Sequence, residues 1–551
     1  GNEAISRGTV ITALNNTPTQ TLDAFEAILD TLADGDKVAM RYFSLSDPRR
    51  EVESVITMDR DWFGVRRCTR DPHSGFWPCH DLAKGPQPTP QQPGTTSFAE
   101  TDDLRGKTIM PSLVLVDFDM PYQIDGVRGT HYVGTGLVVD AQRGLVVVDR
   151  NTVPASIGDV NLIFAGSLEV PGKVVMIHPY HNLSLVSYDP KLIGDTPVRS
   201  ATFTTAPLAP GDPIWLAGLK RNHQLAVQET TVASVDALSV PVPSVPWFRD
   251  FNIKLVSITN QLATIGGVLL DEEGRVAALW ADFAFQNGKK IASVLRGIPT
   301  DLVMEFADVV KRGGPLSMRS LEAELYLTSL VDARRRGLPE QWLKKLAAHS
   351  PKRREVLSVT RLVAGTPASR LLRESDLLLA AGGVPISDFR EVEKAAQAAV
   401  MKLTILRSGE VMDVDVPTVE LSGRGTDRIV GWAGALMQRP PRALAAQRGF
   451  LDEGIYVAWT WWGSPANHFG LAGTLRIVEV DGVAVPDLDS FLKVVSGKAD
   501  RESVRLKVID LGGRDRVLTL KLDLHYWPMF ELRRSADGWQ RRDDFVPPMV
   551  H

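Results

Sequence analysis

Two cysteines, Cys68 and Cys79, lie close to His73 and His80 in one short segment, RRCTRDPHSGFWPCHDL. Thiolates and imidazoles are the ligands that zinc prefers, so these four side chains could complete a tetrahedral zinc site. The same local spacing would allow a loop-closing disulfide, which would indicate an oxidising compartment. The pair could also be two unrelated free thiols. These three alternatives stay open, and we predict a Cys68–Cys79 disulfide as a candidate and no bound metal.

A second group of reactive side chains, His178, His181 and Ser184, lies in the segment IHPYHNLSLV. An imidazole within hydrogen-bond reach of a serine hydroxyl can act as its general base. The group belongs to one expected strand, however, and no serine of the chain has a Gly-x-Ser-Gly-Gly context. We therefore expect the two histidines to be strand-edge or loop residues.

The chain that must position these residues is long enough for several domains. Its 551 residues exceed one hydrophobic core, since a domain usually takes about 100 to 200. A hydrophobic fraction of 44%, a charged fraction of 23% and a net charge of −4 are those of an ordinary globular protein. This balance argues against a nucleic-acid partner. No apolar run approaches the roughly 18 residues of a membrane helix, so we expect no membrane insertion.

One unit is repeated along the chain. Its clearest copies are GTPASRLLRESDLLLAAGGVPISDFREVEKAA, from Gly365, and GSPANHFGLAGTLRIVEVDGVAVPDLDSFLKVV, from Gly463. Each has a Gly-[Ser/Thr]-Pro-Ala turn, an apolar strand, and a helix that is predicted to begin at Asp388 or Asp487. A partial third copy contains Gly8, which corresponds to Gly473, so its turn would begin before residue 1. The sequence therefore predicts that the chain opens inside such a unit.

This unit resembles the PDZ domain of the HtrA/Deg family. The resemblance implies the C-terminal part of a PDZ domain at 1–60 and whole domains at 315–420 and 425–530. PDZ domains bind an extended peptide as an added strand and hold its carboxylate in a loop of backbone N–H groups. By the resemblance, the loop and the start of the binding strand are Trp432, Ala433, Gly434, Ala435 and Leu436, and in the earlier copy Tyr326, Leu327, Thr328 and Ser329.

The two copies do not match the PDZ loop equally well. Thr328 stands where the family has a loop glycine, and it has less backbone freedom to turn N–H groups inward. The later copy, with Gly434, fits better. In the alternative, either copy only packs against its neighbours.

The central module, 106–310, is rich in short apolar strands separated by Gly, Pro and Asn turns, which is typical of a β-barrel or sandwich. Three of its segments resemble the HtrA/Deg protease domain: GTGLVVDAQRGLVVVDRNTV, NLSLVSYDP and TIGGVLLDEEGRVAAL. The resemblance implies a mainly β chain with α+β modules, in which a trypsin-like double β-barrel is flanked by PDZ domains.

The resemblance places the catalytic histidine, aspartate and serine positions on Asn151, Asn182 and Ile265. An amide is no general base, and an isoleucine side chain has no lone pair to attack with. The former oxyanion loop falls on Ala263 and Thr264, where a Cβ replaces the family's glycine. We therefore expect this chain to be no enzyme but a pseudoprotease.

The order of modules resembles the C-terminal half of long, duplicated HtrA/Deg proteins of the fungal nuclear pro-apoptotic, plant chloroplast and bacterial types. A Pro-rich linker at 61–105 and a tail at 531–551 complete the order. The resemblance implies the substrate-binding, regulatory and oligomerising portion of a protein-quality-control protease with chaperone character. An active endopeptidase with misaligned residues and a purely structural scaffold are the alternatives.

The expected partners follow from the same resemblance. They are unfolded or C-terminal polypeptide segments, further copies of this chain, and an active protease domain upstream or in trans. We expect no cofactor. The isolated cysteine pair favours the periplasm, and the resemblance gives the nucleus and the chloroplast as alternatives.

Overall fold

The computed structural model describes Ile5 and residues 8–60, 62–82, 85–127, 129–451, 453–536 and 538–543. The chain divides into two compact units, Gly1–Gly94 and Thr95–His551, and each is treated by itself. Among the described residues, none of the helices combines the length and the apolar character needed to cross a membrane.

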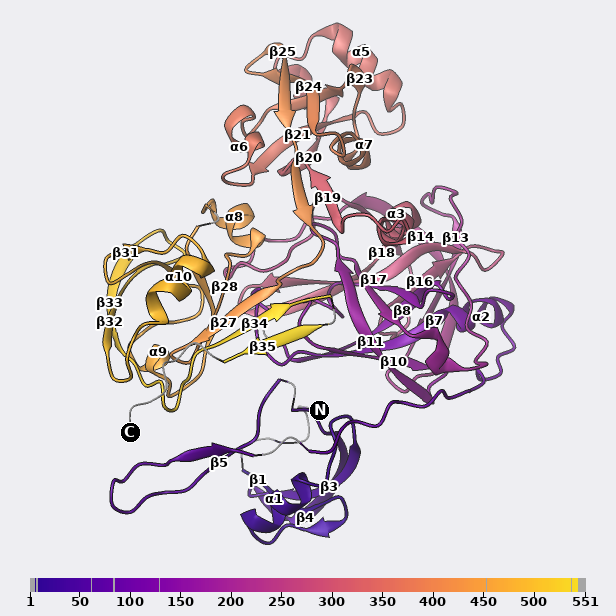
Figure 1. Ribbon diagram of the computed structural model, residues 1–551. Coiled ribbons are helices and arrows are strands. Elements are labelled where there is room, and N and C mark those ends of the chain that lie inside the picture. The colour runs from indigo at the N-terminus through magenta and orange to yellow at the C-terminus, as the bar shows by residue number, and fades with distance from the viewer. Residues whose placement is uncertain are drawn as a thin grey trace. The chain divides into compact units, whose positions relative to one another are not determined.

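The first unit is an antiparallel sheet with one helix (Figure 1). Its elements are β1 (Thr9–Leu14), β2 (Thr17–Pro18), α1 (Leu22–Leu29), β3 (Lys37–Ser44) and β4 (Asp47–Thr57). The strands lie in the order β2-β1-β3-β4. Thr21 begins the helix because its side chain accepts the N–H of Ala24. Apolar residues of α1, β1 and β3 then share one small core.

The segment predicted as a linker contains a hairpin. β5 (Arg66–Cys68) and β6 (Cys79–Asp81) pair with Cys68 opposite Cys79, and a disulfide joins the two. With both sulfurs in this bond, neither the zinc site nor the free thiols exist in this structure. So short a ladder needs the covalent link, because an isolated two-stranded hairpin is marginal in water. Residues 85–103 contain neither helix nor strand.

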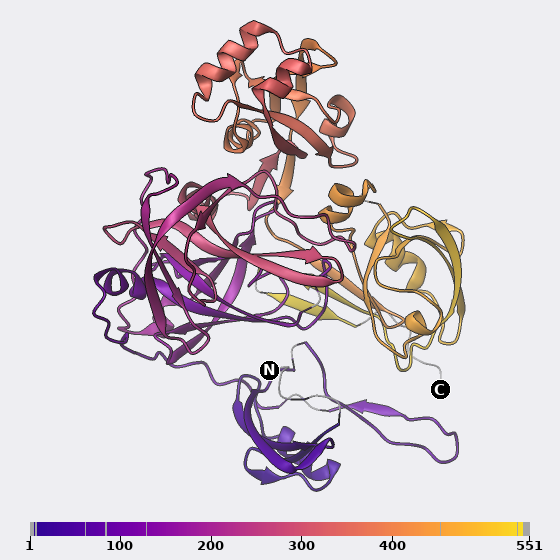
Figure 2. The same cartoon turned by 180° about the vertical axis from the view of Figure 1, so that it is seen from behind.

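Two closed six-stranded barrels form the centre of the second unit (Figure 2). The first consists of β7 (Leu113–Asp119), β8 (His131–Asp140), β9 (Leu145–Val148), β10 (Asp159–Phe164), β11 (Leu168–Ile177) and β12 (Ser184–Tyr188). The second consists of β13 (Pro213–Leu219), β14 (Leu225–Ala237), β15 (Lys254–Ile258), β16 (Gly267–Leu270), β17 (Val276–Asn287) and β18 (Lys290–Pro299). Their short helices are α2 (Leu104–Ile109), η1 (Met110–Ser112), η2 (Pro190–Ile193) and α3 (Thr300–Lys311).

The barrel orders are β10-β11-β12-β9-β8-β7 and β13-β14-β15-β18-β17-β16. Closure pairs every strand on both sides, which removes the exposed edges of an open sheet. Buried residues of both barrels and of α3, such as Leu137, Val268 and Phe306, belong to one core. The predicted trypsin-like double barrel is confirmed.

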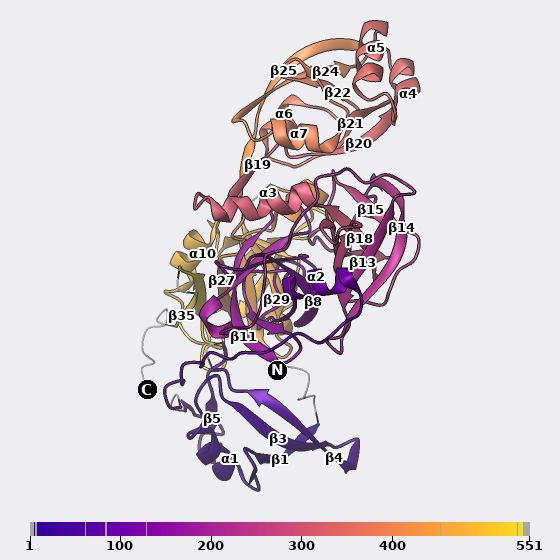
Figure 3. The same cartoon turned by 90° about the vertical axis from the view of Figure 1, so that its right-hand side faces the viewer.

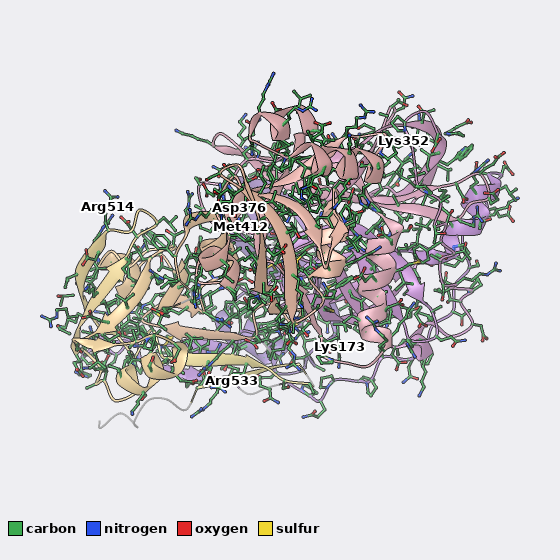
Figure 4. The ribbon with its side chains drawn as sticks, turned by 90° about the horizontal axis from the view of Figure 1, so that it is seen from above. Lys173, Lys352, Asp376, Met412, Arg514 and Arg533 are labelled. Atoms are coloured by element: carbon green, nitrogen blue, oxygen red, sulfur yellow. A yellow bond between two sulfur atoms is a disulfide. The ribbon has the colours of Figure 1, made fainter. Side chains whose placement is uncertain are left out.

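The module after the barrels begins with β19 (Ser317–Ser320), which pairs with β26 (Val419–Ser422). Between them lie β20 (Ala323–Ser329), α4 (Leu330–Arg335), α5 (Glu340–His349), β21 (Glu355–Leu362), α6 (Pro367–Leu371), β22 (Leu377–Ala381), β23 (Val384–Pro385), α7 (Phe389–Ala395), β24 (Val400–Arg407) and β25 (Glu410–Pro417). The main sheet has the order β20-β21-β22-β24-β25. We call this the first PDZ module; Asp376 and Met412 mark it in Figure 4.

The last PDZ module has a larger sheet. Its elements are β27 (Arg428–Trp432), β28 (Ala435–Gln438), α8 (Arg442–Arg448), β29 (Ile455–Thr460), α9 (Pro465–His468), β30 (Arg476–Val480), β31 (Val483–Ala484), α10 (Leu488–Val495), β32 (Ser503–Ile509), β33 (Asp515–Lys521), β34 (Phe530–Arg534) and β35 (Trp539–Arg542). The sheet order is β33-β32-β30-β29-β28-β27-β34-β35.

Two expectations about these modules can be compared with the structure. The predicted helix starts are confirmed, since Asp388 and Asp487 cap α7 and α10 with their side chains. The predicted tail from 531 is wrong over residues 531–542, because β34 and β35 form a hairpin that extends the sheet from β27. Its polar, arginine-rich sequence concealed strands that are partly exposed. The end of the predicted tail, 544–551, lies outside the described residues.

Candidate functional site

The predicted triad positions lie where the two barrels meet. Asn151 follows β9 of the first barrel, and its Nδ2 donates to Oδ2 of Asp282 on β17 of the second, at 2.9 Å. Asn182 precedes β12, and its Nδ2 donates to the carbonyl of Asp282 at 2.7 Å. The backbone N–H of Thr135 donates to the carbonyl of Ile265 at 2.7 Å, which joins the third position to β8. The barrels thus bring all three positions to one interface.

Two carboxylates, the buried Asp149 and the half-buried Asp282, hold this interface together and were not singled out by the sequence analysis. Asp149 accepts the N–H of Thr152 at 2.7 Å and that of Asp282 at 3.1 Å, so it joins the two barrels. Burial, helped by the charge of Asp282, raises the pKa of Asp149 to about 6. Burial also raises the pKa of Asp282. A signal existed, because each aspartate ends or interrupts an apolar run, VVVD and ALWAD.

The two residues of the predicted oxyanion loop, Ala263 and Thr264, differ in solvent exposure. Ala263 is exposed, whereas Thr264 is buried and its hydroxyl has no hydrogen-bond partner among the described residues. An oxyanion hole needs donors converging on one point. The structure assigns no such role to either residue.

His178 and His181 were expected at an edge, and the structure places them in the loop between β11 and β12 but fully buried. His181 Nδ1 lies 3.0 Å from Asp250 Oδ1, and Nε2 lies 3.4 Å from Glu393 Oε2 on α7. Burial disfavours the imidazolium, yet these two carboxylates raise the pKa of His181 to about 10. The ring therefore carries a positive charge near neutral pH and bridges the barrels to the first PDZ module.

The histidine–serine cluster is not a shifted triad. The hydroxyl of Ser184 donates to the carbonyl of Val153 at 2.8 Å, and His181 is engaged by Asp250. Asp250 also accepts the N–H of Asn182 at 2.8 Å. The bridge continues through Arg390 of α7, which pairs with Asp301 at 3.0 Å and with Glu305 on α3 (Figure 3).

The last PDZ module does not offer the strand edge that the sequence predicts. β28 pairs with β29 on one side and with β27 on the other, so both of its edges are taken. The proposed loop residues Trp432, Ala433, Gly434, Ala435 and Leu436 are all buried. Ala433 and Gly434, with φ of 52° and 73°, form the tight turn that folds β27 back onto β28. The prediction of an open peptide-binding edge is wrong for this structure, because the preceding strand occupies it.

The first PDZ module leaves the corresponding strand open. Within the described residues, β20 has a single neighbour in its sheet, β21. Tyr326, Leu327, Thr328 and Ser329, predicted as the loop and the start of the binding strand, all belong to β20, so the loop part of that prediction is wrong. The turn before the strand contains Glu322, with φ of 60°.

A side chain of the second barrel lies at the start of this open edge. Asn252 Nδ2 donates to the carbonyl of Ala323 at 2.8 Å, and Asn252 Oδ1 accepts the N–H of Leu325 at 2.7 Å. This amide pairs with the strand as the backbone of an added strand would. Because backbone direction alternates along a strand, the N–H of Leu327 points to the same open side.

Comparison with known proteins identifies relatives along nearly the whole chain. Protease Do-like 7 of Arabidopsis thaliana is 35% identical over 492 residues, which are 81% of this chain and 45% of that protein. Pro-apoptotic serine protease nma111 of Neosartorya fischeri is 31% identical over 551 residues, 97% of this chain and 53% of that protein. A PDZ domain-containing protein of Schizosaccharomyces pombe is 30% identical over 544 residues, 97% of this chain and 54% of that protein.

The chain spans about half the length of the curated relatives it matches. No family model matches it. Among solved structures, an HtrA-type protease, AlgW with tripeptide, is similar with a TM-score of 0.42 and 15% identity, covering 57% of this chain and 96% of that one.

These relatives correct one expectation and bear on another. The expectation of a pseudoprotease is wrong, because proteins aligned with 81 to 97% of this chain are named proteases or serine proteases. That expectation depended on the side chains at three positions of this chain, whereas the activity in those names is that of proteins about twice its length. The relatives come from a plant and from fungi, so the comparisons do not support the periplasm. The chain belongs to the HtrA/Deg family of serine proteases with PDZ domains.

Proposed function

We propose that this chain is part of a serine endopeptidase of the HtrA/Deg type and that it captures polypeptide segments at the open edge of β20. Its alignment over 97% of its length with a named serine protease supports the first half of the proposal. The edge position of β20, which has β21 as its one neighbour among the described strands of its sheet, supports the second, because such an edge is a template for strand addition.

The proteolytic half is tested on the full-length protein that contains this chain. We expect it to digest casein, and we expect a fluorophosphonate to stop the digestion by labelling the nucleophile. No digestion, and no labelling of the folded protein, would contradict the proposal. The position of the label, mapped by mass spectrometry, assigns the nucleophile.

The peptide-binding half is tested at Leu327, whose N–H faces the open side of β20. Leu327→Pro removes this donor, and an edge strand tolerates proline at such a position. Leu327→Ala removes the same side chain but keeps the N–H, so it is the matched control. We expect Leu327→Pro to weaken binding of unfolded or C-terminal peptides about tenfold relative to Leu327→Ala, measured by fluorescence anisotropy. Equal binding by the two variants would exclude strand addition at β20.

Three further expectations about the whole protein stay proposals. Assembly with other copies of this chain is tested by light scattering, and Trp462, which is 81% exposed, is the first contact to replace. Cooperation with a protease domain upstream or in trans is tested by adding this chain to such a domain and measuring casein digestion. The compartment is tested by imaging the tagged protein in the nucleus and the chloroplast.

A further inference from the structure

A cavity of about 380 Å³ opens beside the interface of the two barrels. Its size falls within the roughly 300–1,000 Å³ of small-ligand sites. Asn151 and Asn182 line it, but most of its wall is apolar. The apolar part consists of Leu238, Val240, Trp247, Phe248, Phe283 and Ile291.

The guanidinium of Arg150 belongs to the wall of this cavity, which Arg249 also lines. Arg150 stacks on the ring of Phe248, with Cζ 4.0 Å from the centroid, and Nη1 donates to the carbonyl of His178 at 3.2 Å. Nε is buried and has no hydrogen-bond partner among the described residues. Burial lowers the pKa of Arg150 to about 10, so the group is still charged near neutral pH.

Two carboxylates, Asp125 and Asp250, interact electrostatically with Arg150, but both accept hydrogen bonds from other groups. Asp125 accepts from Thr426 at 2.8 Å and from Gln438 at 2.6 Å. Asp250 accepts from His181 and from Asn182, at 3.0 and 2.8 Å. Arg150 forms no ion pair among the described residues, although a buried charge is costly without a partner. Arg249 and Lys289 add two further cations to the lining, and Asp125 and Asp250 add two anions.

We propose that this cavity binds an apolar carboxylate, whose anionic end pairs with Arg150 and whose apolar body lies against Trp247 and Phe283. A guanidinium presents several N–H donors to a carboxylate, and water exclusion by apolar walls strengthens the pair. The carboxylate could belong to the last residue of a polypeptide or to a free acid. This inference is independent of strand addition at β20 and of proteolysis.

The first experiment compares an acid with its neutral amide on the intact chain. Binding of N-acetyl-phenylalanine and of N-acetyl-phenylalaninamide is measured by calorimetry and by tryptophan fluorescence. We expect the acid to bind about tenfold more tightly or better, because hydrogen bonds to charged groups are the stronger class. Equal binding of acid and amide, or no binding of either, would overturn the proposal.

The second experiment asks whether Arg150 is responsible. Arg150→Met keeps a long apolar side chain and removes the charge, so we expect the preference for the acid to disappear. Arg514→Met is the matched control, since Arg514 is exposed in the last PDZ module (Figure 4). Thermal unfolding reports whether each variant is folded. Ala284→Phe fills the cavity and leaves the guanidinium, so it should also abolish binding. An unchanged preference for the acid in Arg150→Met, or unchanged binding in Ala284→Phe, would contradict the assignment.

The last comparison separates the sources of the ligand and the two binding sites. Octanoate and octanamide represent a free acid, and an acetylated Ala-Ala-Phe peptide with its amide represents a polypeptide end. Preference for either acid over its amide supports the proposal and identifies the source. The Leu327→Pro variant, which lacks the donor at β20, should bind these acids unchanged. Loss of their binding in that variant would move the site to the PDZ edge and overturn the proposal.

Discussion

The two PDZ modules of this chain differ at one corresponding strand, β28 in the last module and β20 in the first. In the last module, β27 folds back and pairs with both β28 and β34. In the first module, as far as the chain is described, β19 pairs with β26 alone and β20 has one neighbour, β21. The side chain of Asn252 contacts the open edge of β20, and in the last module the corresponding edge of β28 is paired with β27.

The difference arises in the turn before each edge strand. A two-residue hairpin turn of type I′ needs two residues with positive φ, and Ala433 and Gly434 both have it. In the corresponding turn of the first module, between β19 and β20, only Glu322 has positive φ, and β19 does not pair with β20 in the part of the chain that the structure describes. Two repeats of one sequence unit therefore differ in the pairing of the edge strand, and the turns before it differ by one left-handed residue. The following predictions test that contrast.

The largest expected effect concerns how the first module is held against the barrels. His181 has a folded-state pKa of about 10, above the ordinary histidine value of 6.5, because of Asp250 and Glu393. A raised pKa means that the stabilisation is complete below pH 6.5 and is lost as pH rises towards 10. We expect a loss on the order of 3 kcal/mol across that range.

The measurement compares the free energy of unfolding of the natural chain and of His181→Gln as a function of pH. Glutamine does not titrate, so the difference between the two curves should shrink from pH 6.5 towards pH 10. A difference that is constant with pH would mean that the imidazole is neutral in the folded protein. Hydrogen exchange should show that the last module is unaffected.

The second prediction breaks the turn that closes the last module. Gly434 has φ of 73°, and a Cβ there would overlap Cβ of Ser464. We expect Gly434→Ala to destabilise the last module by about 2 kcal/mol. Gly383→Ala in the first module is the control, because Gly383 has φ of 81° but no atom within 4 Å of the position that a Cβ would take. Hydrogen exchange of each module gives the two costs, and equal costs would show that only φ matters.

The third prediction compares the ion pairs that hold β27 and β19. Arg428 pairs with Glu531, which is fully buried, at 2.5 Å and with Asp489 at 2.7 Å. Arg319 and Glu420 are 3.6 Å apart and partly exposed. Arg428→Met should cost about 1.5 kcal/mol, since Arg533 still contacts Glu531 at 2.7 Å. Arg319→Met should cost less than about 1 kcal/mol. Urea unfolding followed by module-specific exchange measures both, and the reverse order would contradict the contrast.

The smallest effect is expected at Asn252. Its amide occupies the carbonyl of Ala323 and the N–H of Leu325, which an added peptide would need. Asn252→Gly preserves the backbone at φ 56° and frees both groups, so peptide binding should tighten about threefold. Asn222→Gly, in an exposed turn, is the control. Weaker binding in Asn252→Gly would mean that the amide helps to hold the peptide.

For much of the site, the sequence predicted which residues belong to it but not which contacts they make. The repeat identified both PDZ modules and the helix starts at Asp388 and Asp487. The repeat did not reveal that β27 pairs with the edge of β28, because the pairing of one strand with another leaves no periodic signal in the sequence of either strand. The contact between Asp149 and Asp282 was missed for the same reason, since the two residues are 133 positions apart in the chain.

The sequence by itself determined the double barrel, the PDZ modules and their order, because apolar alternation and turn residues are local signals. The sequence also identified Asn151, Asn182 and Ile265 as the residues at the triad positions. Only the tertiary structure decided which PDZ edge is open, and how Arg150 comes to face an apolar cavity without an ion-pair partner among the described residues. Those properties depend on contacts between segments that are distant in the chain, and the free energy of such a contact cannot be predicted from the sequence of one segment alone.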